Sequence, residues 1–214
     1  MSSLQSHARN LLMRLWLVRH GKTFLPNEAA VFLGRHQDAA LTDAGITQAD
    51  AVAAYFKTDE VKVKAAYVSG AQRTRVFAER IREANQDSFP IVYDARLDEV
   101  DYGAWTGLTA DAVISAFGQE AYNAYQERGI WPKGAGFVDD PHILRNETLA
   151  LSAELIERHV GEDVLVVGHN GRLRDFLALA PELTAFRKEA GEHKIACGHL
   201  ALLTYEESAR WRVN

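Results

Sequence analysis

The chain has very little cysteine: Cys197 is the only one among its 214 residues. A single cysteine excludes an intrachain disulfide and any metal cluster held by several thiolates. Because structural disulfides belong to oxidising compartments, this usage fits a cytoplasmic protein. The chain also lacks an excess of basic residues, since 24 Lys and Arg stand against 29 Asp and Glu and give a net charge of 24 − 29 = −5. We therefore expect neither nucleic acid nor an anionic membrane surface as a partner.

Long apolar runs are absent as well. No stretch approaches the roughly 20 apolar residues that a membrane-spanning helix needs. Residues 1–13 carry Arg9 and only a very short apolar run, whereas a secretory signal has a longer apolar core and a small-residue cleavage site. Since no repeat or linker is visible, we expect a flexible leader over residues 1–13 and a single domain over residues 14–214.

Short apolar runs alternate with amphipathic stretches along the chain. The runs predict strands at residues 15–18, 65–68, 91–93, 164–167 and 200–205. Helical spacing predicts one helix capped by Thr42 or Asp43 and running through Phe56, and others at residues 71–84, 109–128, 147–160 and 172–180. Glycines and prolines predict a loop at residues 129–146. This alternation predicts an α/β fold, a three-layer α/β/α sandwich with a mostly parallel central sheet.

Unusual polar residues follow three of the predicted strands. They occur in residues 19–23, 69–73 and 168–171, which include Arg19, His20, Thr23, Arg73 and His169. In sheets of this type the ligand crevice lies at the carboxyl ends of the strands. Arginine offers a forked donor that suits phosphate oxygens, and histidine can act as a nucleophile, a base or a metal ligand. Each segment alone also fits a capped loop with a structural or surface side chain, so their convergence is the main indication of a site.

An irregular, acidic stretch covers residues 97–107. It holds two glycines, a tryptophan and three carboxylates, Asp98, Glu99 and Asp101. Any of the three could serve as an acid or base, and composition alone does not choose between them. A solvated acidic turn explains the same residues without any catalytic role.

Five segments of the chain resemble, in the order in which they occur, the motifs of the histidine phosphatase superfamily, also called the phosphoglycerate mutase-like family. Residues 17–23 carry Arg-His-Gly, and residues 41–49 match Leu-Thr-x-x-Gly-x-x-Gln-Ala. Residues 69–74 are similar to Ser-x-x-x-Arg-Thr, residues 97–107 match the acid-bearing loop, and residues 167–174 match the second-histidine element. Any one motif is weak to moderate, but five in the correct order are a strong signal for a phosphoglycerate mutase-like fold.

The resemblance implies a role for each matching position. His20 would be the nucleophile that takes up the phosphoryl group, and Glu99 would protonate the leaving oxygen and later accept a proton from water. Arg19, Arg73 and a protonated His169 would surround the phosphate, which is where phosphoryl transfer gains most from positive charge.

Further phosphate-binding positions are expected at Thr23, Asn27 and Asn170. The site would need no metal and no cofactor. The resemblance therefore implies a phosphomonoester hydrolase acting on a phosphorylated small molecule or phosphoprotein, and it leaves the oligomeric state open.

Several positions depart from the family pattern and leave the substrate open. Pro26 and Leu33 stand where Asn and Gln are common, Asn170 replaces the usual Gly after the second histidine, and the stretch around Gly136 lacks the expected Glu. Residues 109–145 are expected to cover the site and set specificity. Five of their side chains are candidates for its lining, although ordinary packing explains each of them: Tyr122, Tyr125, Trp131, Phe137 and His142.

The sequence fits several other functions less well, and two stay open. Gly21–Lys22–Thr23 does not form a nucleotide-binding P-loop, because Trp16 stands where that motif needs a glycine. The eight histidines are dispersed, with no His-Glu-x-x-His pair for a metal site. A phosphoglycerate mutase-type phosphotransferase and a non-catalytic phospho-ligand binding protein stay open, although Trp105 and Gly107 lead directly into a predicted helix, which favours the phosphatases.

Overall fold

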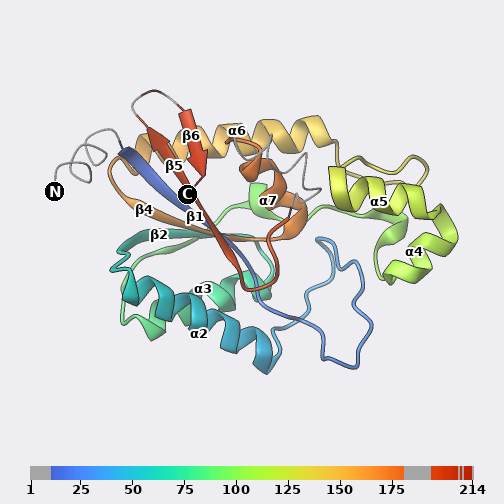
Figure 1. The fold of residues 1–214 in the computed structure, drawn as a ribbon, viewed down its shortest axis with the longest axis horizontal. Helices are drawn as coiled ribbons and strands as arrows, with labels where there is room; N and C mark the ends of the chain where they lie inside the picture. The colour runs from blue at the N-terminus through green and yellow to red at the C-terminus, as the bar shows by residue number, and fades with distance from the viewer. Residues whose placement is uncertain (1–10, 181–193, 207, 209, 214) are drawn as a thin grey trace.

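The computed structural model describes residues 11–180, 194–206, 208 and 210–213. These residues form a six-stranded sheet in the order β3-β2-β4-β1-β5-β6 (Figure 1). The strands are β1 (Leu11–Arg19), β2 (Val63–Val68), β3 (Ile91–Tyr93), β4 (Asp163–Gly168), β5 (Leu200–Glu206) and β6 (Arg210–Val213). The pairs β1–β4, β2–β4 and β2–β3 are parallel, and β5 and β6 add an antiparallel edge.

Helices cover both faces of this sheet. They are α2 (Asp43–Thr58), α3 (Gln72–Ala84), α4 (Ala110–Phe117), α5 (Gln119–Arg128), α6 (Pro141–Arg158) and α7 (Asn170–Leu177), with short 3₁₀ turns η1 (Ala95–Leu97) and η2 (Gly103–Trp105). Figure 1 shows α2 and α3 on one face, α6 and α7 on the other, and α4 and α5 beyond the end of the sheet. The predicted three-layer arrangement with a mostly parallel sheet is confirmed.

Two apolar cores follow from the alternation of side chains along the central strands. In β1, Leu15 and Leu17 face the helices α6 and α7, whereas Trp16 and Val18 face α2 and α3. The strand β4 is buried over its whole length, as expected for a strand covered on both faces. Fixed between two cores, the carboxyl ends of β1 and β4 lie side by side, with Arg19 in register with Gly168.

Several predicted boundaries were wrong. The strand β1 begins at Leu11, inside the range predicted as a leader, and residues 1–10 lie outside the described residues. The predicted helix at 109–128 is two helices, because Gly118 has a φ of 90° and turns the chain between α4 and α5. The helix predicted at 147 begins at Pro141, whose ring suits the first turn and whose N-cap Asp140 accepts from the His142 N–H.

The segment between Val100 and Leu144 builds a third, aromatic core. Trp105 is fully buried at its centre, and its ring lies 5.2 Å from Phe32, 5.5 Å from Tyr125 and 5.3 Å from Phe137 in edge-on contacts. Phe32 comes from the long connection between β1 and α2. This core therefore fixes the connection against α4 and α5, and the two together border the carboxyl end of the sheet.

Candidate active site

The end of β1 carries His20 into the interior of the molecule. Its backbone N–H donates to the Gly168 carbonyl at 3.2 Å, so the ladder with β4 continues past Arg19. A Cβ added to Gly21 would lie 2.4 Å from the Gly45 carbonyl oxygen, a distance no side chain tolerates. Glycine at both positions therefore lets α2 pack directly against the turn that follows His20.

The imidazole of His20 is held in one tautomer. Its Nδ1 lies 2.8 Å from the Gly21 carbonyl oxygen, which can only accept, so Nδ1 carries the proton and Nε2 keeps its lone pair. Burial, together with the cations Arg73 and Arg19, lowers the pKa of His20 to about 3. The side chain is therefore neutral near pH 7, with Nε2 available as a nucleophile.

His169 faces His20 from the end of β4. The two rings are 5.1 Å apart at an angle of 65°. Nε2 of His169 lies 2.7 Å from the Ser69 hydroxyl, while the buried Nδ1 has no partner among the described residues. Burial and the neighbouring His20, Arg73 and Arg19 lower the pKa of His169 well below its ordinary value. This favours a neutral His169 over the protonated one predicted from the sequence; a bound dianion would raise the pKa again.

Two arginines approach the same place from different elements. Arg73, in the first turn of α3, is buried and donates from Nη1 to the Gln37 carbonyl at 2.8 Å and from Nη2 to the Gly34 carbonyl at 3.2 Å. Arg19 donates from Nη1 to the Ile195 carbonyl at 3.1 Å. The buried Nε of each arginine has no partner within the described chain. Carbonyls thus orient both guanidinium groups, and Arg73 also lies 3.8 Å from the half-exposed Asp38 carboxylate.

The structure distinguishes the three carboxylates of the acidic loop. Asp98 accepts from the Gly70 N–H at 2.7 Å, and Asp101 accepts from the Gly103 N–H at 3.0 Å, so both carboxylates hold backbone in place. Glu99 is 8% exposed and accepts from the Val100 N–H at 3.0 Å. Of the three carboxylates, Glu99 is the one that lines the large cavity beside His20.

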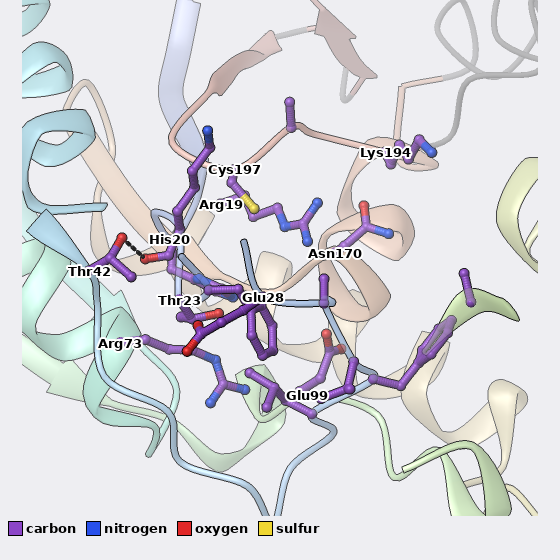
Figure 2. A pocket seen from close by; sticks show the side chains of 18 of the residues that line it. Arg19, His20, Thr23, Glu28, Thr42, Arg73, Glu99, Asn170, Lys194 and Cys197 are labelled. Atoms are coloured by element: carbon purple, nitrogen blue, oxygen red, sulfur yellow. Dashed lines mark hydrogen bonds between the residues drawn. The ribbon is translucent and has the colours of Figure 1, made fainter. Parts of the chain in front are cut away.

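A cavity of about 860 Å³ opens beside these side chains. Figure 2 shows Arg19, His20, Arg73 and Glu99 arranged around its space. A smaller cavity of about 120 Å³ is lined by His169 and shares Arg73 and Glu99 with the first. A neutral nucleophile, two cations with unused N–H groups and a carboxyl group are thus gathered at one place, a set that suits transfer of a phosphoryl group.

Comparison with known proteins identifies the family. The family model for the histidine phosphatase superfamily (branch 1) matches residues 15–213. The chain belongs to the histidine phosphatase superfamily. This confirms the resemblance carried by the five sequence motifs.

Similar proteins include both mutases and phosphatases. A 2,3-bisphosphoglycerate-dependent phosphoglycerate mutase of Bartonella quintana is 30% identical over 156 residues, covering 65% of this chain and 74% of the mutase. A mycobacterial glucosyl-3-phosphoglycerate phosphatase superimposes with a TM-score of 0.72 at 24% identity, covering 94% of this chain and 96% of that one. The phosphoglycerate mutase of Bacillus anthracis gives a TM-score of 0.73 at 19% identity, over 97% and 94% of the two chains. The phosphoglycerate mutase-like fold is confirmed.

The remaining predicted phosphate-site residues of this superfamily member separate into two groups. Thr23 and Asn170 line the large cavity. Asn27 does not line it: its side chain is exposed in a turn where the Glu28 N–H donates to the Leu25 carbonyl at 3.0 Å. That turn leaves Asn27 exposed to solvent, and its role in binding phosphate stays a prediction.

The predicted specificity segment supplies only part of the cavity wall. Tyr122 and Tyr125 line it. Trp131 and Phe137 instead pack against one another at 5.0 Å in the aromatic core, and His142 is exposed in the first turn of α6. Ordinary packing therefore explains Trp131 and Phe137, whereas His142 neither packs in this core nor lines the cavity.

Sequence reasoning missed lining residues that come from distant segments. Lys194 and Cys197 precede β5 and reach the cavity, as Figure 2 shows. Gln48, in the second sequence motif, is the residue that could have indicated this contact. Its side-chain amide donates to the Cys197 carbonyl at 2.8 Å and accepts from the Lys22 N–H at 2.9 Å. Gln48 thereby joins the loop after His20 to the segment before β5.

The described residues hold neither a metal-binding group nor a membrane-spanning helix. Over the described ranges, no three His, Cys, Asp or Glu side chains lie together as a metal-binding group. Within the same ranges, no helix is both long and apolar enough to cross a membrane.

Proposed function

We propose that the protein hydrolyses phosphomonoesters in two steps through a phosphohistidine at His20, without a metal. One observation carries the proposal most directly. The His20 side chain is fixed as the tautomer with a free Nε2, is neutral because its pKa is about 3, and stands beside two guanidinium groups. A neutral nucleophile in a positive field is what attack on a phosphate dianion requires.

In the first step Nε2 of His20 attacks phosphorus and the bond from phosphorus to the ester oxygen breaks. Glu99, in its acid form, gives its proton to the leaving oxygen, so that an alcohol departs. Arg19 and Arg73 would stabilise the equatorial oxygens, and His169 would donate from Nδ1, the atom that has no partner among the described residues. The products are the alcohol and phosphohistidine.

In the second step water attacks the phosphohistidine. The Glu99 carboxylate takes a proton from the water as the new bond to phosphorus forms, and the bond between phosphorus and Nε2 breaks. Inorganic phosphate leaves, and both His20 and Glu99 return to their starting states. Glu99 suits both steps because its loop fixes its backbone: the Arg35 Nε donates to the Glu99 carbonyl at 3.1 Å.

A phosphoglycerate mutase-type phosphotransfer is the second candidate, favoured by the 30% identity to enzymes of that name. The two functions share the first step and differ in whether water or a second substrate takes the phosphoryl group. A phosphorylated small molecule is the proposed substrate in either case. A cytoplasmic location stays a prediction from the sequence.

The test measures both outcomes in one reaction. The protein is incubated with 3-phosphoglycerate and 2,3-bisphosphoglycerate, or with a general alkyl phosphate, and phosphate release and 2-phosphoglycerate are quantified. We expect phosphate release that is lost in His20→Gln and kept in His142→Gln, the exposed-histidine control. Formation of 2-phosphoglycerate faster than phosphate release would replace the hydrolase by the mutase. If no phosphoester is turned over, both enzyme proposals are refuted, and a non-catalytic protein that binds phosphorylated ligands is the function that remains.

A further inference from the structure

The walls of the large cavity differ in character from its phosphate end. Building on the proposed hydrolase, we propose that the organic part of the substrate is apolar, uncharged and larger than glycerate. It would lie against the apolar wall, a name used here for Phe24, Leu25, Val31, Leu33 and Tyr122.

The apolar wall comes from two segments that the aromatic core holds together. Its first four side chains lie on the connection between β1 and α2, and Tyr122 comes from α5. Phe32, within the same connection, packs edge-on against Tyr122 at 6.4 Å and hydrogen-bonds through its backbone N–H to the Leu108 carbonyl at 3.0 Å. The wall is therefore part of a packed structure.

These side chains are left in contact with solvent. Leu25 is 49% exposed, and Phe24, Val31, Leu33 and Tyr122 are partly buried at the cavity surface. Apolar surface gathered in one concave patch is typical of a binding site, because covering it with an apolar ligand removes it from water. Leu33 and Pro26, which also lines the cavity, stand where the family pattern commonly has polar residues, so this character belongs to this chain.

The charge beside the apolar wall disfavours a second anionic group on the substrate, in addition to its phosphate. The only ionisable residue in the connection from Phe24 to Leu33 is Glu28, whose carboxylate accepts from the Leu25 N–H at 2.8 Å and lines the cavity. The cavity residues contributed by α4 and α5 are uncharged. Lys22, two residues before Phe24 on the same connection, and Lys194, from the segment before β5, also border the cavity, but neither belongs to the apolar wall. A substrate carboxylate that lies against the apolar wall would therefore face the Glu28 carboxylate, which repels it, and would find no cation within the wall.

The volume of the cavity also favours an organic group larger than glycerate. Cavities of roughly 300–1,000 Å³ hold ligands of drug size, and this one measures about 860 Å³ over the described residues. A glycerate group would leave most of the wall uncovered. A substrate with an aryl or alkyl chain would bury it, and each buried methylene favours binding about fourfold.

The ranking of matched substrates tests this proposal. The substrates are 2-phenylethyl phosphate, glycerol 1-phosphate and 3-phosphoglycerate, of which the first two are primary alkyl esters with similar leaving groups. We expect kcat/KM for phenylethyl phosphate to exceed that for glycerol phosphate by about tenfold or more, because a phenyl group is buried. 3-Phosphoglycerate should be the poorest. Equal or reversed ranking would overturn the proposal while leaving the hydrolase intact.

Binding of non-hydrolysable analogues separates the two proposals. Calorimetry with 3-phenylpropylphosphonate and 3-hydroxypropylphosphonate measures the same preference without turnover. A preference for the phenyl compound in an enzyme that hydrolyses nothing would refute the hydrolase and support the apolar site. No preference between the two phosphonates would refute the apolar site.

Substitutions assign the preference to the wall. Leu33→Gln should reduce the ratio of phenylethyl to glycerol phosphate kcat/KM by about fivefold, whereas Leu149→Gln, an exposed leucine on α6, should leave it unchanged. Glu28→Gln should raise kcat/KM for 3-phosphoglycerate by up to about fivefold, the size of an exposed charge interaction, and should change kcat/KM for phenylethyl phosphate less. An unchanged ratio in Leu33→Gln, with the fold intact by circular dichroism, would contradict the assignment.

Discussion

Gly171 leaves the space that Glu99 occupies, and replacing it with alanine tests the role of that carboxylate. A Cβ at position 171 would lie 2.3 Å from Oε1 of Glu99, whereas ordinary contact begins at 3.4 Å, so the oxygen would have to retreat by 3.4 − 2.3 = 1.1 Å. The same Cβ would meet Val100 and Tyr102 at 2.9 Å, which limits the ways in which the loop can relax. A displacement of about 1 Å in a reacting group costs on the order of 100-fold in rate.

We therefore expect kcat of Gly171→Ala on an alkyl phosphate to fall about 100-fold, within the range of general acid catalysis. An aryl phosphate with a good leaving group needs less help from an acid and should lose much less. Alanine itself favours the helix α7 by up to about 1 kcal/mol, so the fold should persist by circular dichroism.

A double-mutant cycle with Glu99→Gln provides the control. If alanine acts by displacing the acid, adding Gly171→Ala to Glu99→Gln should change kcat by less than about threefold, because residues acting as one unit are not additive. Unchanged kcat in the single variant, or an equal loss in both backgrounds, would refute the role given to Glu99.

Three further outcomes follow from the site. Arg73→Lys keeps the charge but loses the fork that reaches the Gly34 and Gln37 carbonyls, so kcat/KM should fall roughly 100-fold or more and urea unfolding should show a loss of about 1–3 kcal/mol; a variant with full kcat/KM would make Arg73 purely structural. Turnover should survive EDTA, and a loss restored by Mg²⁺ or Zn²⁺ would contradict a metal-free mechanism. Burial lowers the pKa of His20 from 6.5 in the unfolded chain to about 3 in the folded protein. Between these two pH values the unfolded chain binds a proton at His20 that the folded protein does not bind. The free energy of unfolding is therefore unaffected by His20 above pH 6.5 and falls as the pH falls from 6.5 toward 3. Urea unfolding at pH 7.5 and 5 should therefore show a smaller drop in His20→Gln than in the wild type, and identical drops would contradict the lowered pKa.

The sequence was most informative where a single physical rule governs position. Parallel strands end at the same edge of a sheet, so polar residues after the strands at 15–18 and 164–167 could be expected to meet. The structure places His20 and His169 with their rings 5.1 Å apart. The unbroken apolar run in β4 likewise predicts a strand buried on both faces.

Predictions failed where the outcome depends on one dihedral or on long-range packing. Apolar spacing continues through Gly118, so nothing in the pattern indicates that its φ of 90° divides α4 from α5. Lys194 reaches the cavity from the segment before β5, which Gln48 holds at Cys197 by a hydrogen bond across about 150 residues of chain.

The phosphohistidine at His20 is the central claim, and rapid quenching tests it directly. The protein is mixed with substrate carrying a radioactive phosphoryl group, stopped in alkali within milliseconds, digested, and the labelled peptide is sequenced. We predict base-stable, acid-labile label on His20, present in Glu99→Gln and absent in His20→Gln. Label on His169, or wild-type turnover with no label at any time, would contradict the account.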